Sequence, residues 1–188
     1  MHSLNQTEQD TILAQVRHWL EAAVIGLNLC PFAKSVHVKG QIRTIVSKAY
    51  TEEELRDDLR TELEYLRDTA ADQVDTTLLV HPFALSDFYD FNDFLDVAQT
   101  ELENLDLDGE IQIASFHPAY QFADTEPGDV TNCTNRAPFP ILHLLREASI
   151  DRAVQAFPDA SEIYERNMET MHKLGMDGWK RLMSQREG

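Results

Sequence analysis

The sequence lacks several features that would place it in a class at once. None of its apolar runs approaches the roughly 18 residues of a membrane-spanning helix. It holds only two cysteines, Cys30 and Cys133, and no CxxC pair, which excludes a disulfide scaffold and a zinc finger. No GxGxxG follows a predicted strand and no GxxxxGK[ST] occurs, so dinucleotide and P-loop sites have no support.

Basic residues are scarce as well. The 188 residues include 16 Lys and Arg against 33 Asp and Glu, a net charge of −17. Such acidity argues against a duplex nucleic-acid binder, which needs a basic surface. Residues 51–110 carry 19 of the acidic residues and only three arginines. They are either solvated helix faces that keep the chain soluble or a docking face for a basic protein partner.

The N-terminal residues 1–11 are polar, and no basic segment followed by an apolar one occurs there. We therefore expect no secretion signal. Together with the two cysteines, this predicts a reducing, cytoplasmic location. The length, with 43% apolar and 26% charged residues, predicts a single globular domain over residues 1–188.

Helices are predicted where apolar residues recur at helical spacing and a capping residue precedes them. The first covers residues 7–29, with Thr7 and Asp10 as its cap, and Cys30-Pro31 ends it. The second follows a capping box at residues 51–54 and runs to about residue 69. Further helices are expected from Ser86, from Pro138 to about residue 157, and after a break at residues 158–161, the last interrupted by Gly175 and Gly178.

Strands are predicted at three short apolar or β-branched runs, residues 42–49, 76–80 and 110–116. Their alternation with long helices indicates parallel βαβ units with right-handed crossovers. The predicted fold is therefore α/β, with a small parallel-rich sheet, flanking helices and a helical C-terminus. A long polar loop is expected over residues 123–135.

Two histidines stand at equivalent places in this pattern. His81 and His117 each lie one residue past a predicted strand, and each precedes a proline. The carboxyl ends of parallel strands share one edge of a sheet, where ligands bind. Two imidazoles there suit general acid/base chemistry, anion binding or metal ligation. The alternative is a pair of buried histidines satisfied by backbone carbonyls.

A second candidate is the polar segment that ends at Arg136 and runs into the helix predicted from Pro138. The free N–H groups and the dipole of a helix N-terminus form a seat for an anion. Arg136 at its mouth suits bidentate binding of a carboxylate or phosphate. Thr134 or Asn135 would otherwise be a simple helix cap. Beyond them, His143 and Glu147 would share one face of the predicted helix, as a weak metal signal or as part of a surface salt network with Arg146.

Cys30 is the third candidate. It precedes a proline-initiated turn that contains Lys34. Helix N–H groups and a nearby lysine would stabilise its thiolate and make it a nucleophile. A free cysteine is otherwise a small buried hydrophobic residue.

Five short motifs carry a resemblance that spans nearly the whole chain. They are CPFA at 30–33, FHP at 116–118, YQFA at 120–123, TNRAP at 134–138 and HLLRE at 143–147. With them the sequence resembles an uncharacterised bacterial family, domain of unknown function family 1415. The resemblance implies a small single-domain bacterial protein and brings no activity, cofactor or catalytic residue.

The leading functional hypothesis is an enzyme, a hydrolase or transferase, that acts on a small anionic substrate. His81 and His117 would be its acid/base pair, with Cys30 as a further catalytic candidate. The substrate would be held or oriented by Arg136, Asn135, Tyr120, Gln121, Lys34 and Arg146.

Three alternatives stay open. A metal-dependent hydrolase would hold a divalent transition metal with His81, His117 and a third ligand. The candidates for that third ligand are His143, Asp124, Glu126 and Asp129. A non-catalytic protein would bind a metabolite or a partner at the same edge, and a thiol enzyme would use Cys30. No interaction with nucleic acid or membrane is expected.

Overall fold

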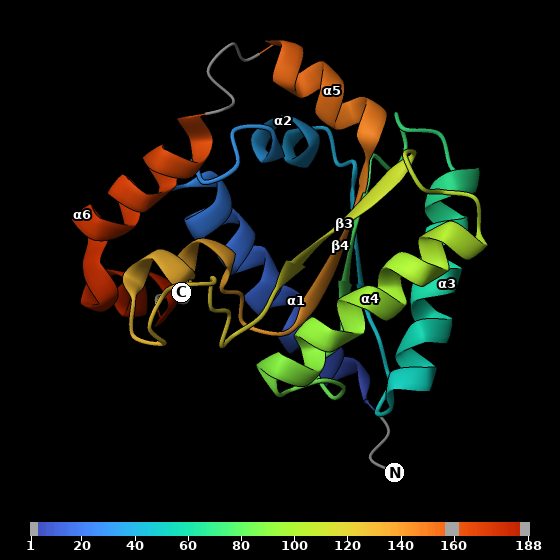
Figure 1. The fold of residues 1–188 in the computed structure, drawn as a ribbon, viewed down its shortest axis with the longest axis horizontal. Coiled ribbons are helices and arrows are strands. Elements are labelled where there is room, and N and C mark those ends of the chain that lie inside the picture. Colours follow the sequence, from blue (N-terminus) through green and yellow to red (C-terminus); the bar gives the residue numbers. More distant parts are fainter. Residues whose placement is uncertain (1–3, 157–161, 185–188) are drawn as a thin grey trace.

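A computed structural model describes residues 4–156 and 162–184, in which a four-stranded sheet lies between two groups of helices (Figure 1). The strands are β1 (Ile42–Val46), β2 (Thr76–Val80), β3 (Ile111–Phe116) and β4 (Ile141–Arg146). Their order is β1-β2-β4-β3; β1 and β2 are parallel, while β4 is antiparallel to both of its neighbours. The predicted α/β class is confirmed, but the sheet is mixed and only partly parallel.

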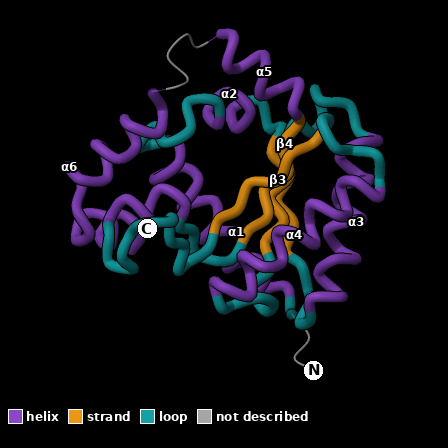
Figure 2. The backbone as a smooth tube through the Cα atoms, viewed as in Figure 1, coloured by secondary structure: helices purple, strands orange, loops and turns teal. Residues whose placement is uncertain are grey.

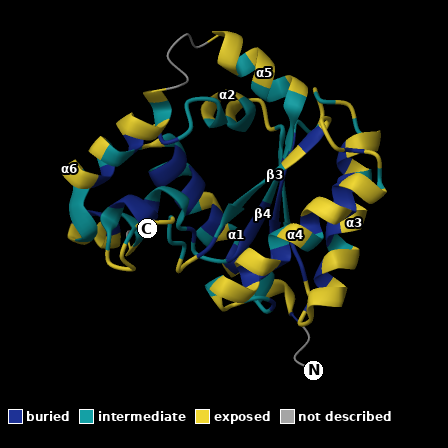
Figure 3. Ribbon diagram, viewed as in Figure 1, coloured by how far each residue is buried: buried dark blue, intermediate teal, exposed yellow. Residues whose placement is uncertain are grey.

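Two long helices cover one face of this sheet (Figure 2). α3 (Glu52–Asp68) begins at the predicted capping box, and α4 (Phe88–Asn104) begins after Asp87, whose side chain accepts hydrogen bonds from two backbone N–H groups. Both turn an apolar stripe inward and leave their acidic sides to solvent (Figure 3). The buried layer between helices and sheet includes Leu55, Leu59, Leu63, Leu66, Phe91, Phe94, Leu79, Leu142 and Leu144.

The opposite face is packed by α1 (Gln6–Trp19), its π-helical continuation η1 (Leu20–Ile25) and α6 (Ile163–Ser184). Asn5 and Glu8 form the capping box of α1, so the predicted cap at Thr7 is wrong. Asn5 accepts from the third helical N–H while Glu8 accepts from the N–H of Asn5, and this reciprocal pair satisfies two otherwise free donors. The first helix is otherwise found largely where it is predicted.

The predicted helix from Pro138 to residue 157 is wrong over its first half. Residues 141–146 form strand β4, and only α5 (Glu147–Ala156) is helical. β4 lies in the middle of the sheet, so its apolar side chains are needed on both faces. A short continuous apolar run of this kind has no periodicity that separates a buried strand from a helix.

Two short elements were not predicted: α2 (Ala33–Val38), within the turn after Pro31, and the 3₁₀ turn η2 (Val130–Asn135), within the expected loop. α2 lies near α5 at one end of the molecule (Figure 1). None of the residues of α2 and α5, all of which the structure describes, is buried. These two helices therefore border the sheet without closing over it.

The described helices include none long and apolar enough to cross a membrane. α6 bends at Gly175, where φ is 68°, a conformation that favours glycine. The predicted interruption is confirmed there, whereas Gly178 remains helical and buried. The predicted break at residues 158–161 lies outside the described residues.

Candidate functional site

The structure brings His81 and His117 together, as their equivalent positions predict. β2 and β3 run in the same direction on either side of β4, so their carboxyl ends share one edge. Both imidazoles pack on Phe91, with ring centroids 5.5 Å and 5.1 Å away. Both are buried, at 0% and 1% exposed. The pair therefore lies under the N-terminal part of α4.

Each of these two rings is bound to a backbone carbonyl. His81 Nδ1 lies 3.0 Å from the carbonyl oxygen of Ala84, and His117 Nε2 lies 3.2 Å from that of Leu85. The other nitrogen of His117 accepts a hydrogen bond from the N–H of Ala119. The remaining nitrogen of His81 is buried and has no hydrogen-bond partner among the described residues. Hydrogen bonding thus holds both rings in a neutral, structural arrangement.

Burial also disfavours the charged forms of this pair. Burial, with a smaller contribution from the nearby His117, lowers the pKa of His81 to about 4. The pKa of His117 is lowered too, chiefly by burial and against the effect of its bond to Leu85. Neither ring lines the cavity described below. The geometry therefore matches the structural alternative for these histidines more closely than the catalytic one, and their catalytic role stays a prediction.

Arg136 is occupied by the loop that follows β3. Its Nε donates to the carbonyl of Tyr120 and its Nη2 to that of Pro127, at 3.2 Å and 2.7 Å. Gln121 donates to the carbonyl of Thr125 in the same loop. Asn135 donates to a carbonyl of β3. These contacts order the loop, and they engage Nε and Nη2 of Arg136 with carbonyls of the chain.

No helix begins at Pro138, so the predicted anion seat at a helix N-terminus is absent from this described region. Sequence reasoning also missed Asn132. Its buried side chain accepts from Phe122 N and the Thr125 hydroxyl, and donates to the carbonyl of Glu126. An asparagine in a polar loop is a familiar turn residue, and that was its only sequence signal.

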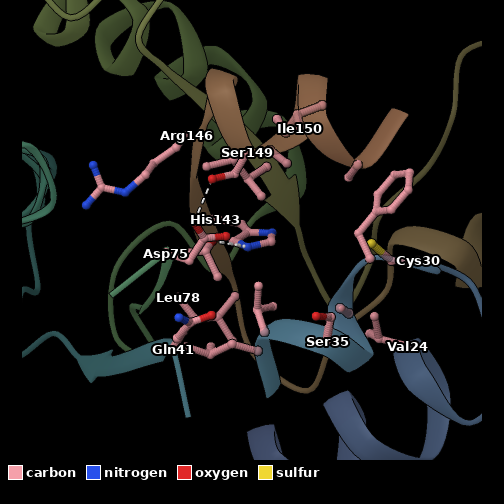
Figure 4. A pocket seen from close by; sticks show the side chains of 18 of the residues that line it. Val24, Cys30, Ser35, Gln41, Asp75, Leu78, His143, Arg146, Ser149 and Ile150 are labelled. Carbon is pink, nitrogen blue, oxygen red and sulfur yellow. Dashed lines mark hydrogen bonds between the residues drawn. The ribbon is translucent and has the colours of Figure 1, made fainter. Parts of the chain in front are cut away.

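A cavity of about 850 Å³ lies over the sheet face that also carries α1 and η1 (Figure 4). α2 and α5 border it, and all four strands contribute to it. Its size is that of a site for a metabolite or cofactor fragment. The walls are mainly apolar and include Trp19, Leu20, Val24, Phe32, Leu78 and Phe116.

His143 projects into this cavity from the middle of β4 (Figure 4). It pairs with Leu78 on one neighbouring strand and Ala114 on the other, and all three line the cavity. The ring keeps some accessible surface because it faces the cavity, although it lies deep enough that burial lowers its pKa to about 4. His143 is therefore neutral near pH 7. Because it lies in a strand, the predicted helix face shared with Glu147 is wrong.

Thr76 determines which nitrogen of His143 carries the hydrogen. The Thr76 hydroxyl lies 2.7 Å from the carbonyl oxygen of Leu144 and 2.7 Å from His143 Nε2. A carbonyl can only accept, so the single hydroxyl hydrogen goes to Leu144. His143 Nε2 must then donate to Thr76 Oγ1. The Nδ1 atom of His143 is left as an acceptor.

Cys30 lines the same cavity (Figure 4). Burial raises the pKa of its thiol, although backbone N–H groups of Phe32 and Ala33 act in the opposite direction. Lys34 is exposed on α2 and does not line the cavity. Cys30 is therefore a neutral thiol near pH 7, less reactive than a free cysteine. Its predicted role as a nucleophile stays a prediction.

Arg146 ends β4, and its Nε and Nη2 are engaged by backbone carbonyls. Its Nη2 lies 2.6 Å from the carbonyl oxygens of both Leu66 and Thr69 and 3.0 Å from that of Val74. Its Nε also donates to Val74, at 3.3 Å. Leu66 and Thr69 belong to the C-terminal end of α3, where carbonyls lack helical partners. Arg146 therefore ties β4 to this helix end, and its predicted role in substrate binding stays a prediction.

No group of three or more His, Cys, Asp or Glu side chains within residues 4–156 and 162–184 is arranged to hold a metal ion. His143 lies on the cavity floor, away from the carboxyl-end edge where His81 and His117 meet. The three histidines of the predicted metal site therefore do not come together.

Comparisons with known proteins identify a family and no activity. A family model described as a protein of unknown function, DUF1415, matches residues 11–181. No curated protein and no solved structure matches the chain. The geometry of the cavity and of the edge is therefore the basis for any functional argument.

Proposed function

Because the chain belongs to the DUF1415 family, whose description assigns no activity, we propose its function from the geometry alone: it binds a small, mainly apolar molecule in the cavity over the sheet. The observation that carries the proposal is a volume of about 850 Å³ whose apolar walls surround one neutral, oriented histidine, His143. Ligand sites combine apolar walls with a few placed polar groups in this way.

A polar side chain on the face of a central strand supports this proposal. The neighbouring positions of β4, Leu142 and Leu144, pack in the core beneath α3 and α4. A leucine in place of His143 would suit a sheet face intended only for packing. The position instead holds an imidazole, whose orientation is fixed by Thr76. Fixed polar groups of this kind provide ligand specificity in apolar pockets.

The carboxyl-end edge supports a ligand site less well. The side chains expected to act there, His81, His117 and Arg136, bind backbone carbonyls of the surrounding loops. The predicted preference for an anionic ligand stays a prediction, because the Arg136 and Arg146 guanidinium groups are both committed to carbonyls.

Two alanines of α5 provide a direct test of binding in the cavity. Ala153 lines the cavity, whereas Ala148 is exposed on the same helix and does not line it. Binding of 2-methoxynaphthalene would be measured by protein NMR titration with wild type, Ala153→Trp and Ala148→Trp. We expect wild type and Ala148→Trp to bind it alike, with shifts around the cavity, and Ala153→Trp to bind at least about tenfold more weakly because the indole fills the space.

Absence of binding to the wild type would reject this proposal. So would binding that Ala153→Trp leaves unchanged, because the probe would then occupy another part of the surface. Thermal unfolding of both variants would establish that each is folded under the conditions of the titration.

Catalysis in the same cavity is the second candidate function. The observation in its favour is that His143 Nδ1 is an acceptor of fixed tautomer, as a general base must be. It would take a proton from a hydroxyl or thiol group of a bound substrate. If the wild type converts a bound ligand and His143→Gln still binds that ligand without converting it, the protein is an enzyme. If the wild type binds the ligand without converting it, the protein is a ligand-binding protein.

A further inference from the structure

We infer that the group a ligand places against His143 is a neutral hydrogen-bond donor, the hydroxyl of a phenol or an alcohol, and not a carboxylate. This inference rests on the proposed function of the cavity and names the class of its ligand. It follows from three observations: the direction of one hydrogen-bond chain, the position of the cations around the cavity, and the acidic side chain that also faces it.

The hydrogen-bond chain runs from His143 through Thr76 to the backbone. His143 Nε2 donates to the Thr76 hydroxyl, which donates to the carbonyl of Leu144. Because the chain ends on a carbonyl, it cannot reverse while both 2.7 Å contacts persist. His143 Nδ1 has no hydrogen-bond partner among the described residues. The ring therefore presents a lone pair to the cavity, which a donor satisfies and a carboxylate repels.

The cations of the lining do not offset this repulsion. The guanidinium of Arg146 points away from His143 (Figure 4), and its Nε and Nη2 donate to backbone carbonyls. Lys39 and Arg152 are exposed, so they belong to the rim of the cavity. A carboxylate beside His143 would lie in an apolar interior without a charged partner, which is among the most costly arrangements in a protein.

One acidic side chain of the lining adds to the penalty for an anion. Asp75 lines the cavity and accepts a hydrogen bond from Ser149 at 2.6 Å (Figure 4). Burial in addition keeps His143 neutral near pH 7, since its pKa is lowered to about 4. An imidazolium that would attract a carboxylate is therefore not formed near neutral pH.

Three naphthalenes of similar shape test the inference: 2-naphthol, 2-methoxynaphthalene and 2-naphthoate. At neutral pH the first carries a hydrogen-bond donor, the second only an acceptor, and the third a negative charge. We expect 2-naphthol to bind about tenfold more tightly than its methyl ether and 2-naphthoate to bind most weakly. The ¹⁵N resonance of His143 Nδ1 should shift with 2-naphthol, as for a nitrogen that accepts a hydrogen bond.

Two valine substitutions distinguish an effect of the hydrogen-bond chain on ligand preference from a general effect on packing. Thr76→Val removes the hydroxyl that fixes the tautomer, so the preference for 2-naphthol over its ether should fall to about twofold or less. Thr77→Val is the matched control, because Thr77 is the next residue of β2 and faces the other side of the sheet. It should leave the preference unchanged. His143→Leu should abolish the preference while 2-methoxynaphthalene still binds.

The outcomes distinguish this inference from the proposed function. If no naphthalene binds, or if Ala153→Trp does not block binding, the proposed site itself is wrong. If all three bind in the cavity with similar affinity, or if 2-naphthoate binds as tightly as 2-naphthol, the site stands and the inference about its ligand is overturned. An unchanged preference in Thr76→Val would likewise overturn it.

Discussion

His81, His117 and His143 each have one ring nitrogen held by a carbonyl or a hydroxyl, and they differ in what the other nitrogen meets. In His117 it accepts a backbone hydrogen bond, and in His81 it is buried without a partner among the described residues. In His143 it faces a cavity. Burial disfavours the protonated form of all three. Residue type alone indicated a titratable group at each position and left this difference open.

The depressed pKa of His81 predicts a loss of stability in mild acid. The unfolded chain binds a proton near pH 6.5 and the folded chain only near pH 4, so stability present above pH 6.5 is lost as the pH falls through this window. Across this pH window His81 contributes about 3 kcal/mol to the free energy of unfolding. His81→Asn keeps a donor for Ala84 and does not titrate, so its free energy of unfolding should fall less steeply between these pH values.

Urea unfolding at a series of pH values measures this slope. His172→Asn is the control because His172 is exposed, and it should keep the wild-type slope. Equal slopes for His81→Asn and wild type would contradict the assignment of His81 as a buried neutral ring.

Arginine illustrates the limit of residue-level reasoning. The sequence predicts that Arg136 and Arg146 bind substrate, which stays a prediction; in the structure both donate to oxygen atoms. The oxygens belong to backbone carbonyls of the chain itself. A guanidinium suits carboxylates, phosphates and carbonyls alike. Only the fold decides which of these lies within reach.

At the scale of elements, β4 shows how a fold assigns secondary structure. The run ILHLLR is compatible with a helix or with a buried strand. In the fold it forms the strand that lies between β2 and β3. β4 then places Leu142 and Leu144 on one face and His143 on the other. At its end, Arg146 binds carbonyls at the C-terminal end of α3. The strand thus joins sheet, helix and cavity.

Loss of the Arg146 side-chain donors should destabilise the fold. Arg146→Met keeps an unbranched side chain without the guanidinium and leaves three carbonyls, those of Leu66, Thr69 and Val74, without this partner. We expect a cost of about 3 kcal/mol in the free energy of unfolding. Amide hydrogen exchange should also accelerate at the C-terminal end of α3.

The control for this prediction is Arg67→Met. Arg67 lies on α3, the helix whose end Arg146 contacts, and pairs with Asp68 at an exposed position. An ion pair contributes little to stability there. Denaturant unfolding should therefore leave Arg67→Met close to wild type. Equal effects of the two substitutions would show that the carbonyl contacts of Arg146 do not stabilise the helix end.

The distribution of charge is a property of the whole molecule. The acidic residues of 51–110 lie largely on the outward sides of α3 and α4, which pack side by side against the sheet (Figure 3). The apolar sides of these helices are needed in the core, so the charge remains in solvent and repels itself. A basic partner for this surface stays a prediction.

Salt should stabilise the protein because it screens this repulsion. The Debye length falls from about 30 Å at 0.01 M to less than about 10 Å above 0.1 M salt. Between low and moderate NaCl we expect a gain of about 1 kcal/mol, which is about 3 °C in Tm for a chain of this size. Asp93→Asn with Asp96→Asn removes two exposed charges of α4 and should reduce the gain; a Tm that falls with NaCl would contradict the argument.

The sequence by itself determined the α/β class, the helix capped at Thr51, the strands β1, β2 and β3, and the bend at Gly175. These features depend on neighbouring residues, whose spacing and caps act locally. The same local logic placed His81 and His117 each one residue past a strand, and they share one edge because β2 and β3 run in the same direction in the folded sheet.

Only the tertiary structure decided the strand state of β4, the partners of Arg136 and Arg146, and the cavity that holds His143 and Cys30. Each depends on segments far apart in the chain. β4 is a strand because two strands leave room for it. The cavity exists because α2 and α5 border the sheet without covering it. Such outcomes follow from packing between elements, on which local periodicity carries no information.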